Sequence, residues 1–335
     1  MNTRLRIATI WAAMLCVLIA LASCTEMDHL PLNVELGGRT VSKLPFVIAA
    51  DQGLFEKYGL DVTLKMPPPR HPGGIRANPG SDWRPDIFVD GLTPNIVKQV
   101  QRARFPDYVA IASNDCIVRN HIIARDGIES LEALKGKRIG ISGRRDTTTG
   151  FAVLELADRM NWDPELDISI QFNGRNVAEL DEGLVDAIMA SETRYAEALL
   201  KGYPILEDTK DWNVAVGGNS AMVDDNWLED ATNREKARRF VQATIEGLAL
   251  YHNDMTLALD VMSRWYGIDD PRILQAIYER GVWMPRKPYP CYEGTENTLR
   301  MYDSMEMRKH APGDFYDDSF VRELDDSGFI DAFYE

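Results

Sequence analysis

The sequence predicts an α/β protein with a purely helical C-terminal region. Between residues 32 and 206, short apolar strand-like segments alternate with segments whose apolar residues recur at helical spacing. From Thr232 onward only the helical spacing remains. Hydrophobic residues make up 45% of the 335 residues, so a core is easily built and two domains of ordinary size are possible.

The first elements form a strand–helix–strand unit. Residues 32–36 alternate apolar and polar residues and end at Gly37, which predicts a strand followed by a turn. Residues 45–58 predict a helix, and Gly59 is placed to end it. Residues 61–66 predict a second strand. Two strands joined by a helix are expected to pair in parallel.

Residues 67–85 interrupt the pattern with six prolines and three glycines, which predicts an irregular loop. The α/β alternation then resumes. Strands are expected over residues 86–89, 108–112, 116–124, 137–142, 168–172, 187–189 and 204–206. Helices are expected over residues 93–100, 129–134, 147–160, 177–183 and 194–200.

The C-terminal region starts with a capping box, Thr232-Asn233-Arg234-Glu235, followed by apolar residues at helical spacing. Asp270-Pro271 marks another helix start, because proline suits the first helical position. Further helices are expected over residues 255–265, 271–280, 296–309 and 319–325.

The N-terminus has the layout of an export signal. Arg4 and Arg6 precede an apolar run over residues 7–22, which is short for a membrane span of about 20 residues. The ending Leu21-Ala22-Ser23-Cys24 resembles a bacterial lipobox, so we expect lipid at Cys24, a signal peptide over residues 1–23 and a tether over residues 24–31. The alternatives are an ordinary signal peptide or an uncleaved anchor.

The formal net charge of −15 argues against a nucleic-acid partner. No pair of histidines has metal-ligand spacing and no Cys-x-x-Cys is present, so we expect no metal and no cofactor. Beyond the N-terminal segment, Cys116 and Cys291 remain. An oxidising compartment would permit a disulfide between them, and two buried thiols are the alternative.

Four blocks of sequence resemble a known family. They are the stretch from Lys43 to Val62 with Ala49-Ala50-Asp51-Gln52-Gly53-Leu54-Phe55, then residues 86–91, 134–141 and 183–188. In this order they resemble the nitrate, sulfonate and pyrimidine-precursor group of periplasmic solute-binding proteins, which serve ABC importers.

The resemblance implies a two-lobed periplasmic-binding-protein fold of type II, the Venus flytrap. Lobe I would comprise residues 32–115 and 218–335, and lobe II residues 116–217. The lobes would be joined by crossings near Asn114–Arg119 and Asn213–Asn219 and would close on a ligand by a hinge motion.

The function that the resemblance implies is that of a solute receptor, not an enzyme. We expect a monomer in the periplasm or at the cell exterior, tethered by lipid, that delivers a small polar ligand to an ABC permease. The alternatives are an enzyme on the same fold, either an aromatic-acid decarboxylase or a pyrimidine-precursor synthase, and a signalling receptor lobe.

Polar residues that follow a strand and open a helix are candidates for ligand binding, because such loops present N–H groups and hydroxyls. Pure helix capping is the alternative for Ser42 and for Thr147–Thr149. Glu192 could recognise an amine or a ring N–H, or simply start a surface helix. The candidate set is Ser42, Lys43, Leu44, Arg70, His71, Asp90, Gly91, Thr93, Asn114, Thr147, Thr148, Thr149, Ser191, Glu192, Tyr195, Trp212, Asn219 and Trp283.

The ligand class stays open at this point. Hydroxyls at helix starts and nearby arginines suit an oxyanion or a carboxylate. Aromatic residues and Glu192 suit a planar aromatic or heterocyclic compound, which the sequence slightly favours. Arg70 and His71 lie in the loop over residues 67–85, which is either a cationic lid over the cleft or a solvated insertion.

Overall fold

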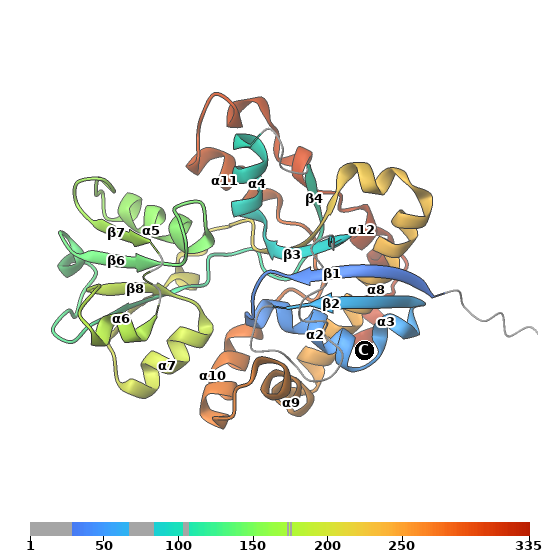
Figure 1. Ribbon diagram of the computed structural model, residues 1–335, viewed down its shortest axis with the longest axis horizontal. Helices are drawn as coiled ribbons and strands as arrows, with labels where there is room; N and C mark the ends of the chain where they lie inside the picture. Colours follow the sequence, from blue (N-terminus) through green and yellow to red (C-terminus); the bar gives the residue numbers. More distant parts are fainter. Residues whose placement is uncertain (1–28, 67–83, 103–106, 173, 175) are drawn as a thin grey trace, which may run out of the picture.

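The computed structural model describes residues 29–66, 84–102, 107–172, 174 and 176–335. It has two α/β lobes, each built on a five-stranded mixed sheet (Figure 1). The fold class predicted from the sequence is confirmed. The expected lipidation site Cys24 and the candidates Arg70 and His71 lie outside the described residues.

Lobe I has the strand order β2-β1-β3-β10-β4. β1, β2 and β3 are parallel, and β10 runs antiparallel between β3 and β4. The strands are β1 Leu30–Leu36, β2 Leu60–Lys65, β3 Ile87–Gly91, β4 Tyr108–Ser113 and β10 Asn219–Asp224. The sequence did not predict β10, which returns to lobe I after the whole of lobe II.

Helices cover both faces of this sheet (Figure 1). In the core, Phe46 and Phe55 stack on Phe240 with ring centroids 5.8 Å and 5.5 Å away. Gly247 lets the helix Ala231–Asn253 approach the helix Leu44–Asp51 closely, because a Cβ at Gly247 would lie 2.4 Å from the Pro45 carbonyl oxygen. The helices are α2 Leu44–Asp51, α3 Leu54–Lys57, α4 Leu92–Gln101, α8 Ala231–Asn253, α9 Met255–Tyr266, α10 Pro271–Gly281, α11 Tyr292–Met301 and α12 Ser319–Asp326.

Lobe II has the strand order β7-β6-β8-β5-β9, with β5 antiparallel to both of its neighbours. Its strands are β5 His121–Ala124, β6 Arg138–Ile141, β7 Ser169–Phe172, β8 Ala187–Ala190 and β9 Ile205–Asp208. Its helices are α5 Thr148–Arg159, α6 Val177–Asp181 and α7 Glu192–Lys201.

Several predicted boundaries were wrong, each for a local reason. The helix over residues 45–58 is divided at Gly53, whose φ of 66° is left-handed. The strand over residues 116–124 is confined to β5, because the residues before it form a crossing between the lobes. The helix expected over residues 129–134 is only a 3-10 turn at Glu132–Leu134. The helix expected over residues 296–309 is α11, which starts at a Cys291 N-cap and ends at Met301.

The chain passes between the two sheets twice, over residues 114–120 and 213–218. These crossings are paired with each other by backbone hydrogen bonds. The Val118 N–H donates to the Val214 carbonyl at 2.9 Å, and the Val216 N–H donates to the Cys116 carbonyl at 3.0 Å. A short antiparallel ladder therefore joins the lobes.

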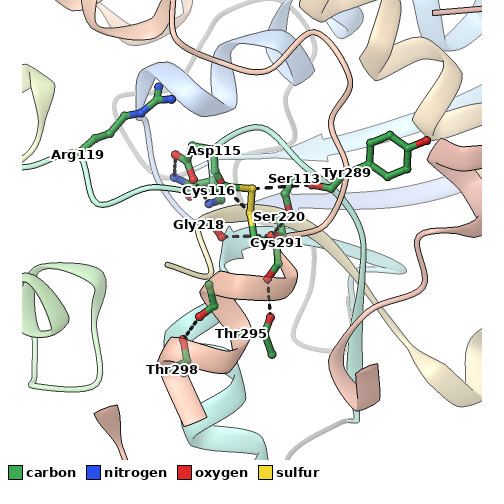
Figure 2. Close-up of a disulfide and its surroundings, with 12 residues drawn as sticks. Ser113, Asp115, Cys116, Arg119, Gly218, Ser220, Tyr289, Cys291, Thr295 and Thr298 are labelled. Carbon is green, nitrogen blue, oxygen red and sulfur yellow. Dashed lines mark hydrogen bonds between the residues drawn. A yellow bond between two sulfur atoms is a disulfide. The ribbon is translucent and has the colours of Figure 1, made fainter. Parts of the chain in front are cut away.

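Helix α11 is fixed against this ladder. A disulfide links Cys116 of the first crossing to Cys291 at the start of α11, with Cα atoms 5.5 Å apart (Figure 2). Asn297 donates its side-chain amide to the Ala215 carbonyl of the second crossing at 3.0 Å. A Cβ at Gly294 would lie 2.3 Å from the Val216 backbone, so only glycine permits this approach.

A second contact between the lobes lies at α10 and α7 (Figure 1). Arg280 of α10 forms an ion pair with Asp208 of β9 and lies over the Tyr195 ring of α7, 5.3 Å from its centroid. In the part of the chain that is described, no helix is both long and apolar enough to cross a membrane.

The disulfide is expected to stabilise the protein, because it closes a loop between cysteines 175 positions apart. Replacing both cysteines by serine should lower the free energy of unfolding by about 2–5 kcal/mol. Urea unfolding of the parent and of the double variant, each with and without a reducing agent, measures this. Reductant should weaken the parent alone, and equal stability of all four samples would contradict the expectation.

Candidate functional site

A cavity of about 620 Å³ lies between the lobes. Lobe I contributes the loop after β1 with Gly37–Thr40 and Lys43, and the end of β3 with Asp90 and Gly91. Lobe II contributes the starts of α5 and α7. The crossings contribute Asp115, Arg119 and Asn120, and β10 contributes its first residue, Asn219. The cavity thus lies beyond the carboxyl ends of the parallel strands, where open α/β sheets bind ligands.

The structure brings half of the predicted residues together in this cavity. Those that line it are Lys43, Asp90, Gly91, Thr147, Thr148, Thr149, Ser191, Glu192 and Asn219. Those that it places outside the lining are Ser42, Leu44, Thr93, Asn114, Tyr195, Trp212 and Trp283.

Ser42 lies one layer behind the cavity wall. Its side chain is buried, and its hydroxyl oxygen accepts a hydrogen bond from the Asn219 side-chain amide at 2.8 Å. Asn114 donates to the Ser42 carbonyl at 2.9 Å. These two residues support Asn219, whose side chain lines the cavity. Leu44 and Thr93 are also buried, in the core of lobe I.

The aromatic candidates are engaged elsewhere. Tyr195 stacks on His121 with ring centroids 3.9 Å apart. Trp212 lies under Arg159 and donates its indole N–H to Glu207 at 3.2 Å. Trp283 is 57% exposed on the surface. Within the described chain, Tyr266 is the aromatic residue that lines the cavity, and its hydroxyl donates to the Thr40 carbonyl at 2.8 Å.

The sequence reasoning missed several lining residues. They are Arg39, Thr40, Lys98, Asp115, Arg119, Asn120, Arg194 and Tyr266. Asp115 and Arg119 fall within the predicted first crossing, so their place between the lobes was a usable signal. Tyr266 ends α9, far from any predicted cleft loop, and no local pattern marks it.

Two helix starts from lobe II face the cavity. The Thr147 hydroxyl caps α5 by accepting from the Gly150 N–H at 3.2 Å, and it donates to the Arg144 carbonyl. Thr149 accepts from the Ser142 N–H at 3.0 Å. The Thr148 hydroxyl has no hydrogen bond among the described residues, and a Cβ at Gly91 of lobe I would lie 3.3 Å from it.

The start of α7, unlike that of α5, has no side-chain cap. Ser191 is its N-cap but makes no side-chain capping bond, although Ser191, Glu192 and Thr193 all line the cavity. Helix starts carry unpaired N–H groups and a partial positive charge, so both suit an anion. The start of α4 is closed by comparison, because the Leu92 and Thr93 N–H groups donate to the Gly218 and Gly217 carbonyls.

The lining residues carry more positive than negative charge. The basic ones are Arg39, Lys43, Lys98, Arg119 and Arg194, and the acidic ones are Asp90, Asp115 and Glu192. Lys43 is almost fully buried and forms an ion pair with Asp90 at 2.8 Å. The cavity therefore opposes the negative charge of the whole chain, which concentrates anions locally.

Glu192 has an unusual environment. It is 8% exposed, and burial raises the pKa of its carboxyl to about 7. The nearby Asp115 carboxylate adds to the rise, while Arg119 and Arg280 oppose it. His121, beneath this region, has its pKa lowered to about 3, chiefly by burial. The described residues hold no cluster of side chains suited to a metal ion.

Residues 111–255 match the family model described as NMT1/THI5 like. The predicted family resemblance is confirmed. No curated protein matches the sequence. Among solved structures, the periplasmic aliphatic sulphonate binding protein SsuA of Escherichia coli superposes with a TM-score of 0.64 at 18% identity, over 88% of this chain and 97% of that chain.

Two further structures bear on function. The periplasmic nitrate-binding protein NrtA of Synechocystis PCC 6803 has a TM-score of 0.66 at 11% identity, covering 90% of this chain and 89% of that one. The desulfurization enzyme DSZB has a TM-score of 0.64 at 13% identity, covering 89% and 99%. At these identities the likeness shows the fold, which binding proteins and an enzyme share.

The raised pKa of Glu192 predicts a pH-dependent stability. Between its ordinary pKa of 4.5 and about 7, the folded protein binds more protons than the unfolded chain, so stability falls as pH rises through that range. Glu192→Gln should remove this loss and be more stable than the parent at pH 8 by up to about 3 kcal/mol.

Urea unfolding across this pH range measures the difference between parent and variant. Glu182→Gln, at an exposed glutamate of the same lobe, is the control and should track the parent. A difference between Glu192→Gln and the parent that stays constant with pH would contradict the expectation.

Proposed function

We propose that this chain is the solute-binding component of an ABC importer and that it captures a small organic anion between its lobes. The observation that carries the proposal is the cavity with the starts of α5 and α7 in its wall and an excess of basic side chains. The confirmed family resemblance and the fold of the sulfonate- and nitrate-binding proteins support it.

The lining favours an anion over a planar aromatic ligand. Tyr195, Trp212 and Trp283 do not line the cavity, so they provide no stacking wall. The positively charged ends of α5 and α7 and the side chains of Arg39 and Arg194 are instead suited to an oxyanion or a carboxylate.

Binding would involve both lobes at once. Thr148 and the α7 start belong to lobe II, whereas Arg39 and Lys43 belong to lobe I. A ligand that bridges them stabilises the closed arrangement only by the interactions that the open arrangement lacks. The paired crossings are the natural hinge, because they are the chain's passages between the two sheets.

The location and partner follow from the same proposal. Lipid at Cys24 would tether a monomer to a membrane in the periplasm or at the cell exterior, where an ABC permease would accept the ligand. A disulfide between Cys116 and Cys291 agrees with an oxidising compartment.

An enzyme on this fold is the alternative, and the buried Glu192 is the observation that favours it. A carboxyl with a pKa of about 7 suits general acid–base chemistry. Among the described residues, however, the lining contains no histidine and no cysteine, and the described cysteines are bonded to each other. To separate the two functions, the protein can be incubated with a solute that it binds and the solute then analysed by mass spectrometry. A receptor leaves the solute unchanged, whereas an enzyme converts it.

Thr148 should contribute to affinity and Thr147 to stability. A panel of sulfonates and carboxylates, screened by thermal shift on the detergent-solubilised full-length chain, identifies acids that raise the melting temperature. Thr148→Ala should weaken binding of such an acid by about 5- to 150-fold, because it removes a hydroxyl that is free to reach the ligand.

The matched variant Thr147→Ala removes the α5 cap and should lower stability by about 1 kcal/mol. Calorimetric titration and melting curves of both variants test the distinction. Should Thr148→Ala bind within about twofold of the parent, the α5 start is not the anion site. Failure of every acid to bind would refute the proposed function.

Cys24→Ala should abolish lipidation, because the thiol is the atom that carries lipid in the expected lipobox. Incorporation of a labelled fatty acid by the parent and by the variant in bacterial cells measures this. Replacement of Cys16 by alanine, within the expected signal, is the control and should leave labelling intact. Equal labelling of the Cys24 variant and the parent would exclude this anchor.

A further inference from the structure

Two of the aromatic residues that lie outside the cavity, Tyr195 and Trp283, occupy the seam where α10 of lobe I faces α7 of lobe II (Figure 1). Arg280, near the end of α10, lies over the Tyr195 ring and forms an ion pair with Asp208 of β9. Lys210 of lobe II lies over the Trp283 ring of lobe I, 5.3 Å from its centroid. A cation of each lobe therefore lies on an aromatic ring of the other lobe.

The lobe I side of this seam is held firmly in place. The Tyr251 hydroxyl of α8 donates to the Tyr278 carbonyl of α10 at 2.6 Å. A Cβ at Gly281, the last residue of α10, would clash with the Val41 side chain, so the end of α10 packs tightly against its own lobe. Arg280 therefore extends from a helix end whose position is fixed.

The lobe II side is held in place as well. Tyr195 stacks on His121 of β5 with ring centroids 3.9 Å apart, and the antiparallel pairing of β5 with β9 sets Asp208 opposite His121. Asp208 also accepts a hydrogen bond from the Lys210 backbone N–H at 3.2 Å. The ring and the carboxylate that contact Arg280 are thus positioned within their own lobe, which lowers the entropy lost when the lobes meet.

The ion pair of the seam differs from an ordinary surface pair. Fully exposed pairs contribute little, because water screens the charges and two mobile side chains must be ordered. The side chains of Arg280 and Asp208 are only 17% and 18% exposed, and the guanidinium also lies on an aromatic face, where partial removal of water strengthens a cation–π contact. Both charges keep some water, which avoids the desolvation cost of complete burial.

None of these five seam residues lines the cavity. Their contacts therefore need no solute, and the free energy that they contribute favours the closed arrangement whether or not the cavity is filled. A solute shifts the balance between open and closed arrangements only by its own differential interactions.

We propose that Arg280, Asp208, Tyr195, Lys210 and Trp283 form a latch that keeps the lobes together in the ligand-free chain. The inference goes beyond the proposed function, because it concerns the chain before any solute binds. Opening of the latch then precedes the entry of a solute between the lobes.

The test measures the distance between the lobes in the detergent-solubilised full-length chain, after dialysis in urea and refolding have removed any bound solute. Two exposed residues, Glu182 of lobe II and Asp269 of lobe I, are replaced by p-acetylphenylalanine and given nitroxide labels, which leaves the cysteines untouched. Pulsed electron paramagnetic resonance gives the distribution of distances between the labels. The parent should show mainly the distance expected from the structure. Arg280→Ala should raise the ratio of a longer distance to this one by about fivefold or more.

Asp208→Asn is the milder variant, because asparagine keeps an oxygen that can accept from the Lys210 N–H. It should also increase the longer distance. The double variant should be no more open than Arg280→Ala, because both changes remove the same ion pair. Arg322→Ala is the control and should match the parent, since it breaks an exposed ion pair with Asp318 inside lobe I.

Melting curves show which variants are folded, and Asp208→Asn decides alone if Arg280→Ala does not fold. A parent that shows mainly the longer distance overturns the latch and leaves the proposed function as it stands. A distribution that stays the same in Arg280→Ala and Asp208→Asn overturns the latch as well.

Discussion

The backbone pairing of the two crossings is the constraint on which the rest of the structure depends. Hydrogen bonds of Val118 with Val214 and of Val216 with Cys116 join the two crossings into one short ladder between the lobes. Helix α11 adds a disulfide and an amide contact to that unit. Any motion that opens the cavity must therefore be a bend of a narrow, cross-linked hinge.

The site then follows from sheet topology. Parallel strands of each lobe end toward the gap between the sheets, so the loops after β1, β3, β6 and β8 face one another. Helix starts in those loops contribute positive ends, and the crossings contribute Asp115, Arg119 and Asn120. A chain with a strongly negative total charge thereby acquires a cavity with the opposite local balance. The net charge of the chain bears on its solubility, whereas the charge preference of the ligand site is set by the residues that line the cavity.

Much of this could be predicted from the sequence, because alternating apolar periods and loop residues are local signals. The threonines at the α5 start and Ser191-Glu192 at the α7 start were found in this way. The sequence could not show that Asn219 lines the cavity while Ser42 lies behind it. Which of these two hydrogen-bonded residues reaches the cavity depends on packing between elements that are distant in the sequence. The prediction that Trp212 and Trp283 bind the ligand was wrong for the same reason, because the sequence around an aromatic residue does not indicate which surface its ring covers. β10 and Tyr266 reach the site only through contacts that are remote in sequence.

The disulfide also bears on the order in which the molecule can be assembled. Lobe II draws its five strands from one continuous stretch, whereas lobe I needs β10 and the five helices α8 to α12 from beyond that stretch. A chain that emerges from its N-terminus can thus complete the second lobe while the first still lacks a central strand. Joining Cys116 to Cys291 requires nearly the whole chain, since loop closure over such a separation comes late without prior structure. A chain in which this disulfide has formed is therefore one in which both lobes have been assembled around the hinge.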